Sequence, residues 1–157
     1  RANFRDRVRF ALARADERNA SAVVIFFDLD NFKHVNDTFG HAAGDTTLRT
    51  ISDRVLGCLR SNDTAARLGG DEFTILIEHI KAIEHSLPVV ERLLAALMEP
   101  IRLNGIEVNV GGSIGVAISV PNEDDVESLL RKADLAMYRA KRSGKGRYVF
   151  FDSTLDK

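Results

Sequence analysis

The feature of the sequence that most restricts its fold is an apolar run at residues 22–27 (AVVIFF), which stops abruptly at Asp28, Leu29 and Asp30. A run of β-branched and aromatic residues without polar alternation is typical of a strand that is buried on both faces. Segments with helical periodicity lie on both sides of this run in the chain, so helices are available to cover such a sheet. We therefore expect residues 22–27 to form a buried strand that ends in two carboxylates.

The rest of the chain alternates between helical and strand-like patterns. Helices are expected over residues 4–18, 31–39 and 45–59, over a segment that begins or bends near Pro88 and ends before Pro100, and over residues 126–140. Strands are expected over residues 64–68, 73–78, 101–103, 106–110, 113–120 and 148–151. This order predicts an α/β fold in which helices flank a mixed central sheet of about five strands. Its β-α-β-β-α-β core is that of ferredoxin-like, palm-type folds.

The predicted strand order has a consequence for two acidic clusters that are far apart in the sequence. A right-handed crossover from the first strand leaves room for one strand between it and the second, and the third strand can return into that gap as a hairpin. The tip of the hairpin holds Gly69 and Gly70, where positive φ angles are expected, followed by Asp71 and Glu72. We therefore expect this tip to lie beside Asp28 at one edge of the sheet.

This acidic edge has the composition of a magnesium site. Asp28 and Asp30 alternate along the strand, so both carboxylates can point to the same face of the sheet. Carboxylate oxygens without His or Cys suit Mg²⁺, which usually completes its coordination with water and substrate phosphates. Glycines such as Gly69 and Gly70 allow a backbone to approach a phosphate or a base closely. An Asp-x-Asp alone would indicate a strand end in solvent; the second acidic cluster on the hairpin favours a functional site.

Composition narrows the class of protein. The chain has 157 residues, which predicts one domain over residues 1–152 and a short tail or linker at 153–157. Its 22 Lys and Arg against 23 Asp and Glu give a net charge of −1, which argues against a protein that binds nucleic acid by covering its phosphates. The single Cys58 excludes an intramolecular disulfide framework and a cysteine-rich zinc site.

The sequence gives no indication of membrane contact by this domain. No wholly apolar run is longer than that of residues 22–27, and no signal-peptide pattern is present. We expect a cytoplasmic domain. Because the chain begins with Arg1 and its first residues already have a helical pattern, we expect it to be part of a longer protein, in which any membrane anchor or sensor lies outside this sequence.

The hairpin and several other segments resemble one family. Residues 67–73 (RLGGDEF) resemble the signature of the GGDEF family of diguanylate cyclases. Residues 28–37 (DLDNFKHVND), followed by Gly40-His41 and Gly44-Asp45, are similar to the family's first motif. Residues 113–117 (SIGVA) and 133–141 (ADLAMYRAK) are similar to its later strand and its last helix. The resemblance extends from residue 1 to about residue 151 and rests on separate motifs in the family's order.

This resemblance implies a catalytic activity. Members of the family make cyclic di-GMP from two GTP and release two pyrophosphates, with a fold similar to that of adenylyl cyclases and polymerase palm domains. Each chain binds one GTP with Mg²⁺ or Mn²⁺, and two chains meet face to face, so the resemblance implies that catalysis needs a homodimer. It also implies that sensor or cyclic di-GMP phosphodiesterase domains are attached in the parent chain.

The resemblance assigns roles to individual residues. Asp28 and Asp71 resemble the carboxylates that hold the metal, with help from the Leu29 carbonyl. Glu72 resembles the residue that activates the attacking 3′-hydroxyl, so Asp71 and Glu72 are the expected catalytic residues. The matching substrate-binding positions are Asn36 and Asp45 as guanine readers, Lys33, Lys141 and Lys145 as phosphate contacts, and Phe32, Asp37, His41, Gly69 and Gly70. An amide and a carboxylate together complement the acceptors and donors of guanine.

A second site is implied by Arg60 and Asp63. In the family, an Arg-x-x-Asp at this position resembles the product-inhibition site, where cyclic di-GMP binds as a stacked pair. Arginine suits this role because it can make a bidentate contact with O6 and N7 of guanine. The same spacing also occurs in ordinary ion pairs at helix ends, which are worth about 0.5 kcal/mol. The position of the pair in the family pattern favours the inhibitory site.

The chain departs from the family pattern in places, and other functions stay open. Lys145 stands where the family often has Arg, and Gly146 where it often has Asn, so Lys145 can meet a phosphate only as a point charge. The turn that usually precedes the first helix is missing, so we expect weak inhibition. One alternative is a non-catalytic domain that binds GTP or cyclic di-GMP and regulates an attached domain. A weaker one is a palm-type nucleotidyltransferase with another substrate.

Overall fold

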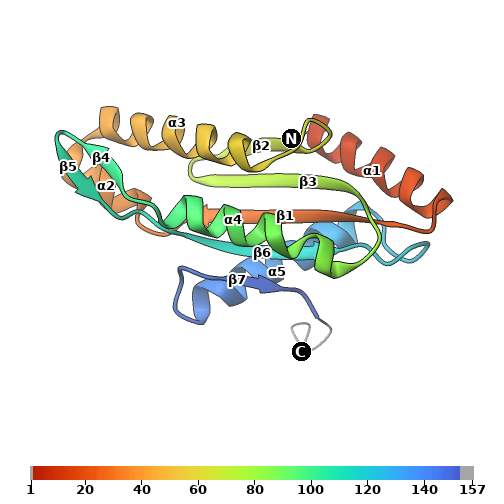
Figure 1. The fold of residues 1–157 in the computed structure, drawn as a ribbon. Coiled ribbons are helices and arrows are strands. Elements are labelled where there is room, and N and C mark those ends of the chain that lie inside the picture. The colour runs from red at the N-terminus through yellow and green to blue at the C-terminus, as the bar shows by residue number, and fades with distance from the viewer. Residues whose placement is uncertain (1, 153–157) are drawn as a thin grey trace.

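The computed structural model describes residues 2–152, apart from the side chains of Ala2, His79 and Ile83; the tail expected at 153–157 lies outside this described part. In chain order the elements are α1 (Ala2–Glu17), β1 (Ser21–Leu29), α2 (Phe32–Phe39), α3 (His41–Cys58), β2 (Thr64–Gly69), β3 (Glu72–Ile80), the short 3₁₀-helix η1 (Ile83–His85), α4 (Leu87–Met98), β4 (Ile101–Leu103), β5 (Ile106–Val108), β6 (Gly112–Ile118), α5 (Val126–Arg142) and β7 (Tyr148–Phe150). Helices flank a mixed sheet, as the sequence predicted (Figure 1).

β1 lies at the centre of the main sheet, whose strand order is β2-β3-β1-β6-β7. It pairs antiparallel with β3 on one side and with β6 on the other, while β7 runs parallel to β6. The third strand has therefore returned between the first and the second, as the crossover rule predicted. Val23, Val24 and Ile25 have no exposed surface, which confirms that this strand is buried on both faces.

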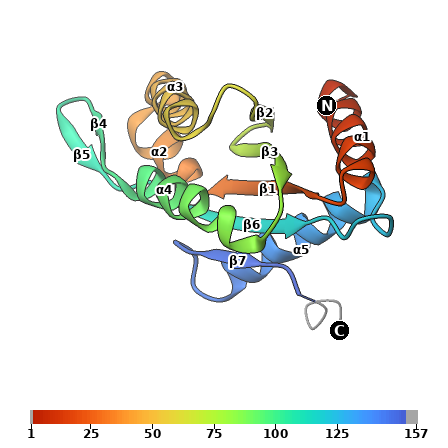
Figure 2. The ribbon, with the colours of Figure 1, turned by 45° about the vertical axis from the view of Figure 1, so that its right-hand side comes forward.

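The two faces of β1 pack against different helices, because successive side chains of a strand point to opposite sides. Val23, Ile25 and Phe27 belong to a core that also contains residues of α3 and α4. Ala22 and Val24 belong to a second core with residues of α1 and α5. Figure 2 shows α5 running alongside β6 and β7. Even-numbered positions of β1, including Asp28, therefore face the side of the sheet that α5 covers.

Close packing of α5 on β6 depends on Gly115. A Cβ atom at this position would lie 2.1 Å from the Met137 backbone nitrogen and 2.3 Å from the Ala133 carbonyl oxygen. A larger residue does not fit without moving the helix, because both of these atoms belong to the backbone of α5. This contact allows α5 to pack close against the sheet. As a result, Lys141 near the end of the helix reaches Asp28 at the end of β1.

α3 does not begin where the sequence predicted, whereas the start of α4 agrees with one of the two options that were left open for Pro88. α3 begins at His41, four residues before Asp45, because Gly40, with a φ angle of 92°, separates it from α2. The extra turn lacks the apolar periodicity on which the prediction depended. α4 begins at Leu87 and so takes the first of the two options for Pro88, which lies in its first turn, where a missing N–H leaves no hydrogen bond unmade.

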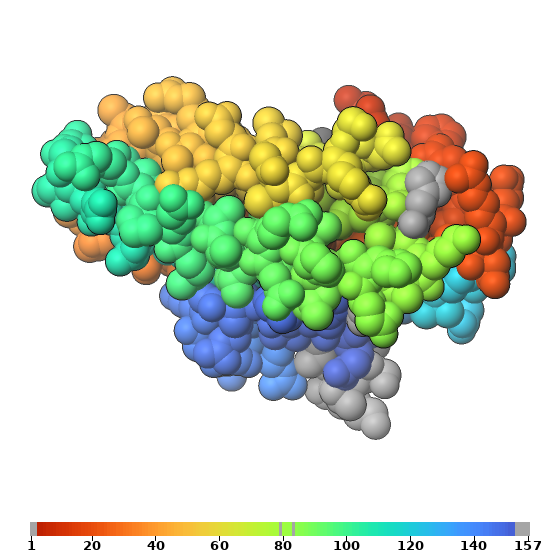
Figure 3. Space-filling model, viewed as in Figure 1, coloured from red at the N-terminus to blue at the C-terminus, as the bar shows by residue number. Residues whose placement is uncertain are grey.

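The β4–β5 hairpin forms a two-stranded sheet of its own at one end of the molecule (Figure 3). Its turn is Asn104-Gly105, and both residues have positive φ, as the sequence predicted. β5 ends at Val108 and not at the expected Val110, because the chain then leaves the hairpin to enter β6. In the described part of the chain, no helix has the length and apolar character that are needed to span a bilayer.

Candidate active site

The pairing of β1 with β3 brings the two acidic clusters of the sequence together. Asp28 in β1 is the register partner of Glu72 at the start of β3. One residue further along β1, the Leu29 backbone N–H donates to the Asp71 carbonyl oxygen at 3.3 Å. The strand order predicted that these two acidic clusters lie side by side, and this prediction is therefore confirmed. We call this region, formed by Asp28, Asp71 and Glu72, the carboxylate edge.

The turn between β2 and β3 has the backbone that its two glycines predict. Gly69 and Gly70 have φ angles of 155° and 51°, and no other atom lies within 4 Å of the position that a Cβ atom would take at either residue. The Arg67 guanidinium donates to the Gly70 carbonyl oxygen at 2.7 Å and so fixes the turn. A role for Arg67 was not predicted; its place in the RLGGDEF string is the sequence signal for it.

Asp28 and Asp71 are two carboxyl groups with one ammonium group beside them. Asp28 is 7% exposed, and its Oδ2 atom accepts a hydrogen bond from the Nζ atom of Lys141. Its Oδ1 atom is buried and has no hydrogen-bond partner among the described residues. Burial, together with the adjacent Asp28 carboxylate, raises the pKa of Asp71 to about 6. The pair is short of positive charge, so the carboxylate edge favours a cation.

The donor atoms of this edge fit a hard divalent cation. They are the buried Oδ1 of Asp28, the carboxylate of Asp71 and the Leu29 carbonyl, and Mg²⁺ and Mn²⁺ prefer oxygen ligands of this kind. In the part of the chain that the structure describes, no cluster of three or more His, Cys, Asp and Glu side chains is suited to a metal. A metal here would therefore take two carboxylates and complete its coordination with backbone, water and phosphate oxygens.

The lysines predicted to contact phosphates differ in their surroundings. Lys141 lies in the last turn of α5 and is held by Asp28. Lys145 is exposed on the turn that follows α5, where its backbone has a φ angle of 61°. Lys33 is exposed in the first turn of α2. The structure therefore brings Lys141 to the carboxylate edge and leaves the ammonium groups of the other two accessible to a ligand.

The residues predicted to read guanine, Asn36 and Asp45, lie where α2 meets α3. A Cβ atom at Gly44 would lie 1.9 Å from the Oδ1 atom of Asn36, so the glycine leaves the space that this amide occupies next to Asp45. A hollow of about 360 Å³ opens beside Asp45. It is lined by Asp45, Leu48, Arg49, Ser52, Asp53 and Arg67. The structure therefore brings the two predicted readers close together, and Asp45 lines the hollow.

The remaining predicted substrate contacts lie on the same pair of helices. Phe32 begins α2, is half-buried and packs against the core on the α3 and α4 side of the sheet. Asp37 and His41 are both exposed, near the end of α2 and at the start of α3. These positions agree with a ligand that spans the α2–α3 junction, and the roles of the individual side chains stay predictions.

The predicted inhibitory pair, Arg60 and Asp63, lies at the end of β2 remote from the glycine turn. The Asp63 carboxylate accepts from the Arg60 backbone N–H at 2.9 Å, while the Arg60 Nε atom is 4.0 Å away. The Arg60 side chain is 68% exposed beside a hollow of about 280 Å³, which Arg92 of α4 also lines. Arg92 was missed because nothing in its sequence position connects it to Arg60. At about 3.3 Å per residue, β2 separates this hollow from Gly69 by about 20 Å.

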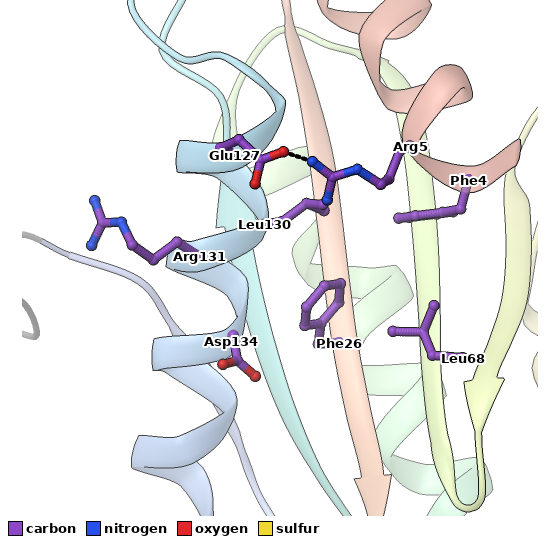
Figure 4. Close-up of a pocket in the computed structure, with 8 residues that line it drawn as sticks. All are labelled: Phe4, Arg5, Phe26, Leu68, Glu127, Leu130, Arg131 and Asp134. Carbon is purple, nitrogen blue, oxygen red and sulfur yellow. Dashed lines mark ion pairs between the residues drawn. The ribbon is translucent and has the colours of Figure 1, made fainter. Parts of the chain in front are cut away.

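A further hollow, of about 410 Å³, lies between α1 and α5 (Figure 4). It is lined by Phe4, Arg5, Phe26, Leu68, Glu127, Leu130, Arg131 and Asp134. Apolar side chains line part of it, and an ion pair between Arg5 and Glu127 joins its two helical walls. It contains none of the residues predicted to bind metal, GTP or cyclic di-GMP, so it is not part of the candidate active site.

The chain matches one family model over most of its length: "Diguanylate cyclase, GGDEF domain" covers residues 1–147. The chain belongs to the GGDEF family. Over 147 residues, this GGDEF domain is 42% identical to the diguanylate cyclase TpbB of Pseudomonas aeruginosa, in a match that covers 93% of this chain and 34% of TpbB. It is 38% identical over 156 residues to the cyclic di-GMP phosphodiesterase PdeR of Escherichia coli, covering 98% of this chain and 23% of PdeR.

A solved structure that comprises only the GGDEF domain of TpbB from Pseudomonas aeruginosa superimposes with a TM-score of 0.94. It is 39% identical, and the match covers 99% of this chain and 91% of that one. The family and the fold that were predicted from the sequence are therefore confirmed. The chain spans about a third of TpbB and less of PdeR, so the activities of those whole proteins are not established for it.

Proposed function

We propose that this GGDEF domain is an active diguanylate cyclase, which joins two GTP into cyclic di-GMP and releases two pyrophosphates. The observation that carries the proposal is the carboxylate edge, where β1–β3 pairing places Asp28 and Asp71 beside the exposed Glu72. The intact RLGGDEF signature and the 42% identity to a relative named as a diguanylate cyclase support the same function.

Mg²⁺ or Mn²⁺ would be held by Asp28 and Asp71, with the Leu29 carbonyl as a further ligand. When bound, the metal would offset the charge of the triphosphate and make the attacking hydroxyl easier to deprotonate. Asp71 must be ionised to act as a ligand, and a pKa of about 6 allows this at neutral pH. Lys141 is already held at this edge by Asp28, where a triphosphate would give its ammonium group a second anionic partner.

The reaction needs a proton acceptor and cations around the phosphates. The 3′-oxygen of one GTP forms a bond to the α-phosphorus of the other, the bond from that phosphorus to pyrophosphate breaks, and Glu72 takes the hydroxyl proton. Glu72 suits this role because it is exposed at the start of β3, next to the carboxylate pair. Lys33, Lys141 and Lys145 would neutralise the phosphates. Most of the rate enhancement would come from positioning and electrostatics.

Recognition of guanine would come from Asn36 and Asp45, whose amide and carboxylate complement its acceptors and donors. The hollow beside Asp45 offers space for the base. Phe32, Asp37 and His41 would line the approach, and the turn at Gly69 would let the backbone pass close to the nucleotide. Because the attacking hydroxyl belongs to a second GTP, two chains must face one another, and catalysis would require a homodimer.

Cyclic di-GMP, the product, would inhibit the cyclase by binding at Arg60 and Asp63. The exposed Arg60 guanidinium can donate to O6 and N7 of guanine, and Arg92 on the other side of the hollow supplies a second guanidinium. About 20 Å of β2 separates this hollow from the glycine turn, so cyclic di-GMP bound there would not occupy the GTP site.

In the parent protein, we propose that sensor or phosphodiesterase domains are attached to this domain. We also propose that this domain lies in the cytoplasm.

A second candidate function is a non-catalytic domain that binds GTP or cyclic di-GMP and regulates an attached domain. The 38% identity to PdeR, a relative named as a phosphodiesterase, is the observation in its favour. A domain that only binds nucleotide needs no exposed base beside a carboxylate pair. The presence of Glu72 beside Asp28 and Asp71 therefore favours the cyclase.

Chromatography of a reaction with GTP and Mg²⁺ separates the two candidates. We expect cyclic di-GMP and pyrophosphate from the wild type and neither from Glu72→Gln, which keeps the size of the side chain and removes its charge. Asp134→Asn, at an exposed position on α5, is the control and should keep wild-type activity. Unchanged GTP from a sample shown by light scattering to be dimeric would refute the cyclase and favour the binding domain.

A further inference from the structure

We propose that Asp30 is a positioning residue for the turn that carries Lys145, an inference that rests on the proposed function above. From its sequence position, Asp30 was expected only to share a strand face with Asp28 in an acidic edge that suits Mg²⁺. The two side chains do face the same side of the sheet, because they alternate along the chain. Asp28 contacts Lys141 in the last turn of α5, and Asp30 contacts the turn that comes directly after that helix.

The Asp30 carboxylate joins this turn to the sheet. Its Oδ2 atom accepts from the Gly146 backbone N–H at 3.0 Å, and its Oδ1 atom accepts from the Ser113 hydroxyl at 2.6 Å. Ser113 is fully buried in β6, so this end of the connection is anchored in the core. Both oxygens of Asp30 are engaged, in contrast to the free Oδ1 of Asp28. Asp30 is therefore placed to support the site and not to act as a metal ligand.

The turn needs an anchor because of its backbone conformation. Gly144, Lys145 and Gly146 follow one another with φ angles of 125°, 61° and 57°. Glycine adopts such angles without strain, but a lysine is held there only when the surrounding structure fixes it. The Lys145 N–H donates to the Ala140 carbonyl oxygen at 3.1 Å on the helix side. The bond from Gly146 to Asp30 holds the turn on the sheet side.

The anchor determines where the Lys145 ammonium can reach. A lysine side chain is long and flexible, so the position of its backbone sets the phosphates within its range. Without Asp30, the Gly146 N–H would lose its partner and the turn would relax. Binding of a triphosphate would then have to order the turn as well as the side chain, which lowers affinity. The effect of Asp30 is therefore expected on the phosphate-dependent part of nucleotide binding, and it should pass through Lys145.

Calorimetric titration with Mg²⁺ and α,β-methylene-GTP, a non-reacting GTP analogue, tests this inference. We expect Asp30→Ala to bind the analogue about tenfold more weakly than the wild type. Asp30→Asn should stay within about threefold of the wild type, because its amide can accept from Gly146 and donate to the Ser113 hydroxyl. GMP, which lacks the outer phosphates, should bind all three proteins alike. Asp30→Ser, too short to reach Gly146, repeats the test if Asp30→Ala does not fold.

A double substitution shows whether Asp30 acts through Lys145. If it does, Asp30→Ala combined with Lys145→Ala should bind the analogue no more weakly than Lys145→Ala alone. Asp124→Ala is the control for lost stability, because it removes a buried carboxylate that accepts from the Val120 N–H and the Ser128 hydroxyl and pairs with Lys132 at the far end of α5. It should melt earlier than the wild type and bind the analogue normally.

The outcomes are distinct. Additive losses in the double substitution would overturn the positioning role, because they mean that Asp30 does not act through Lys145. Equal losses in Asp30→Ala and Asp30→Asn would also overturn it, because they mean that the charge of Asp30 acts directly. Wild-type affinity in Asp30→Ala would also overturn it. A wild-type protein that makes no cyclic di-GMP from GTP contradicts the proposed function instead, and that result is separate from the behaviour of the Asp30 variants.

Discussion

Replacing Asp71 with Asn should make the metal-free domain more stable at neutral pH while it removes activity. In the wild type, burial and the neighbouring Asp28 carboxylate raise the pKa of Asp71 to about 6. The folded state therefore binds this proton more tightly than the unfolded state does. The resulting stability is fully present below about pH 4 and is lost as the pH rises through about 6. Above that pH, the folded wild type holds a carboxylate in an unfavourable place.

The size of the effect follows from the pKa difference. The change from the ordinary value of 3.8 to about 6 corresponds to about 3 kcal/mol. Asp71 is only half-buried, and solvent screening reduces this to about 1 kcal/mol. For a domain of this size, a free-energy change of about 1 kcal/mol moves the melting temperature by about 2–4 °C.

Thermal unfolding in the presence of EDTA, at about pH 4 and about pH 7.5, measures this difference. We expect Asp71→Asn to melt about 2–4 °C above the wild type at the higher pH, with a much smaller gap at the lower pH. Added Mg²⁺ should raise the melting temperature of the wild type and leave that of the variant unchanged, because a ligand of the folded state stabilises it. Asp134→Asn, the exposed control, should melt with the wild type at both pH values. Equal melting temperatures at pH 7.5, or a gap that is independent of pH, would refute the reasoning.

Four other substitutions test separate parts of the structure. Gly44→Ala should displace the Asn36 amide, because a Cβ atom would lie 1.9 Å from its oxygen, and calorimetry should show about tenfold weaker GTP binding by a folded protein. Gly115→Ala should lower the free energy of unfolding in urea by more than about 3 kcal/mol, because its Cβ atom meets the backbone of α5. Burial favours a higher pKa for the Asp124 carboxyl, but hydrogen bonds outweigh it and lower the pKa. Asp124→Ala should therefore cost about 2 kcal/mol in urea unfolding above pH 5, and progressively less below about pH 4. Arg60→Ala should abolish calorimetric binding of cyclic di-GMP and leave GTP turnover intact. An unchanged value in the named measurement would contradict the structural reason in each case.

The carboxylate edge could be predicted from the sequence because it depends on chain topology. The buried run at residues 22–27 identifies a central strand, and the glycine hairpin can only return beside it. The register that results pairs Asp28 with Glu72, whatever the details of packing around them. The resemblance to the family, and not chain topology, assigned Asn36 and Asp45 as guanine readers; that they lie close together follows from their place on neighbouring helices of one short segment.

The contacts that could not be predicted are those between side chains of distant elements. Lys141 was expected to bind phosphate. Its pairing with Asp28 depends on the close packing of α5 against β6, and no spacing in the sequence indicates how close that packing is. The anchoring of the last turn by Asp30 and the position of Arg92 beside Arg60 arise in the same way. The early start of α3 was missed because its first turn lacks apolar periodicity.

The most direct test of whether Asp28 and Asp71 form a metal site that serves the nucleotide is a titration with Mn²⁺ in the presence of α,β-methylene-GTP. The electron paramagnetic resonance signal of the free ion measures how much Mn²⁺ is bound. We expect the wild type to take up Mn²⁺, Asp71→Asn not to do so, and Asp134→Asn to bind as the wild type does. Equal uptake of Mn²⁺ by the wild type and by Asp71→Asn would contradict this expectation.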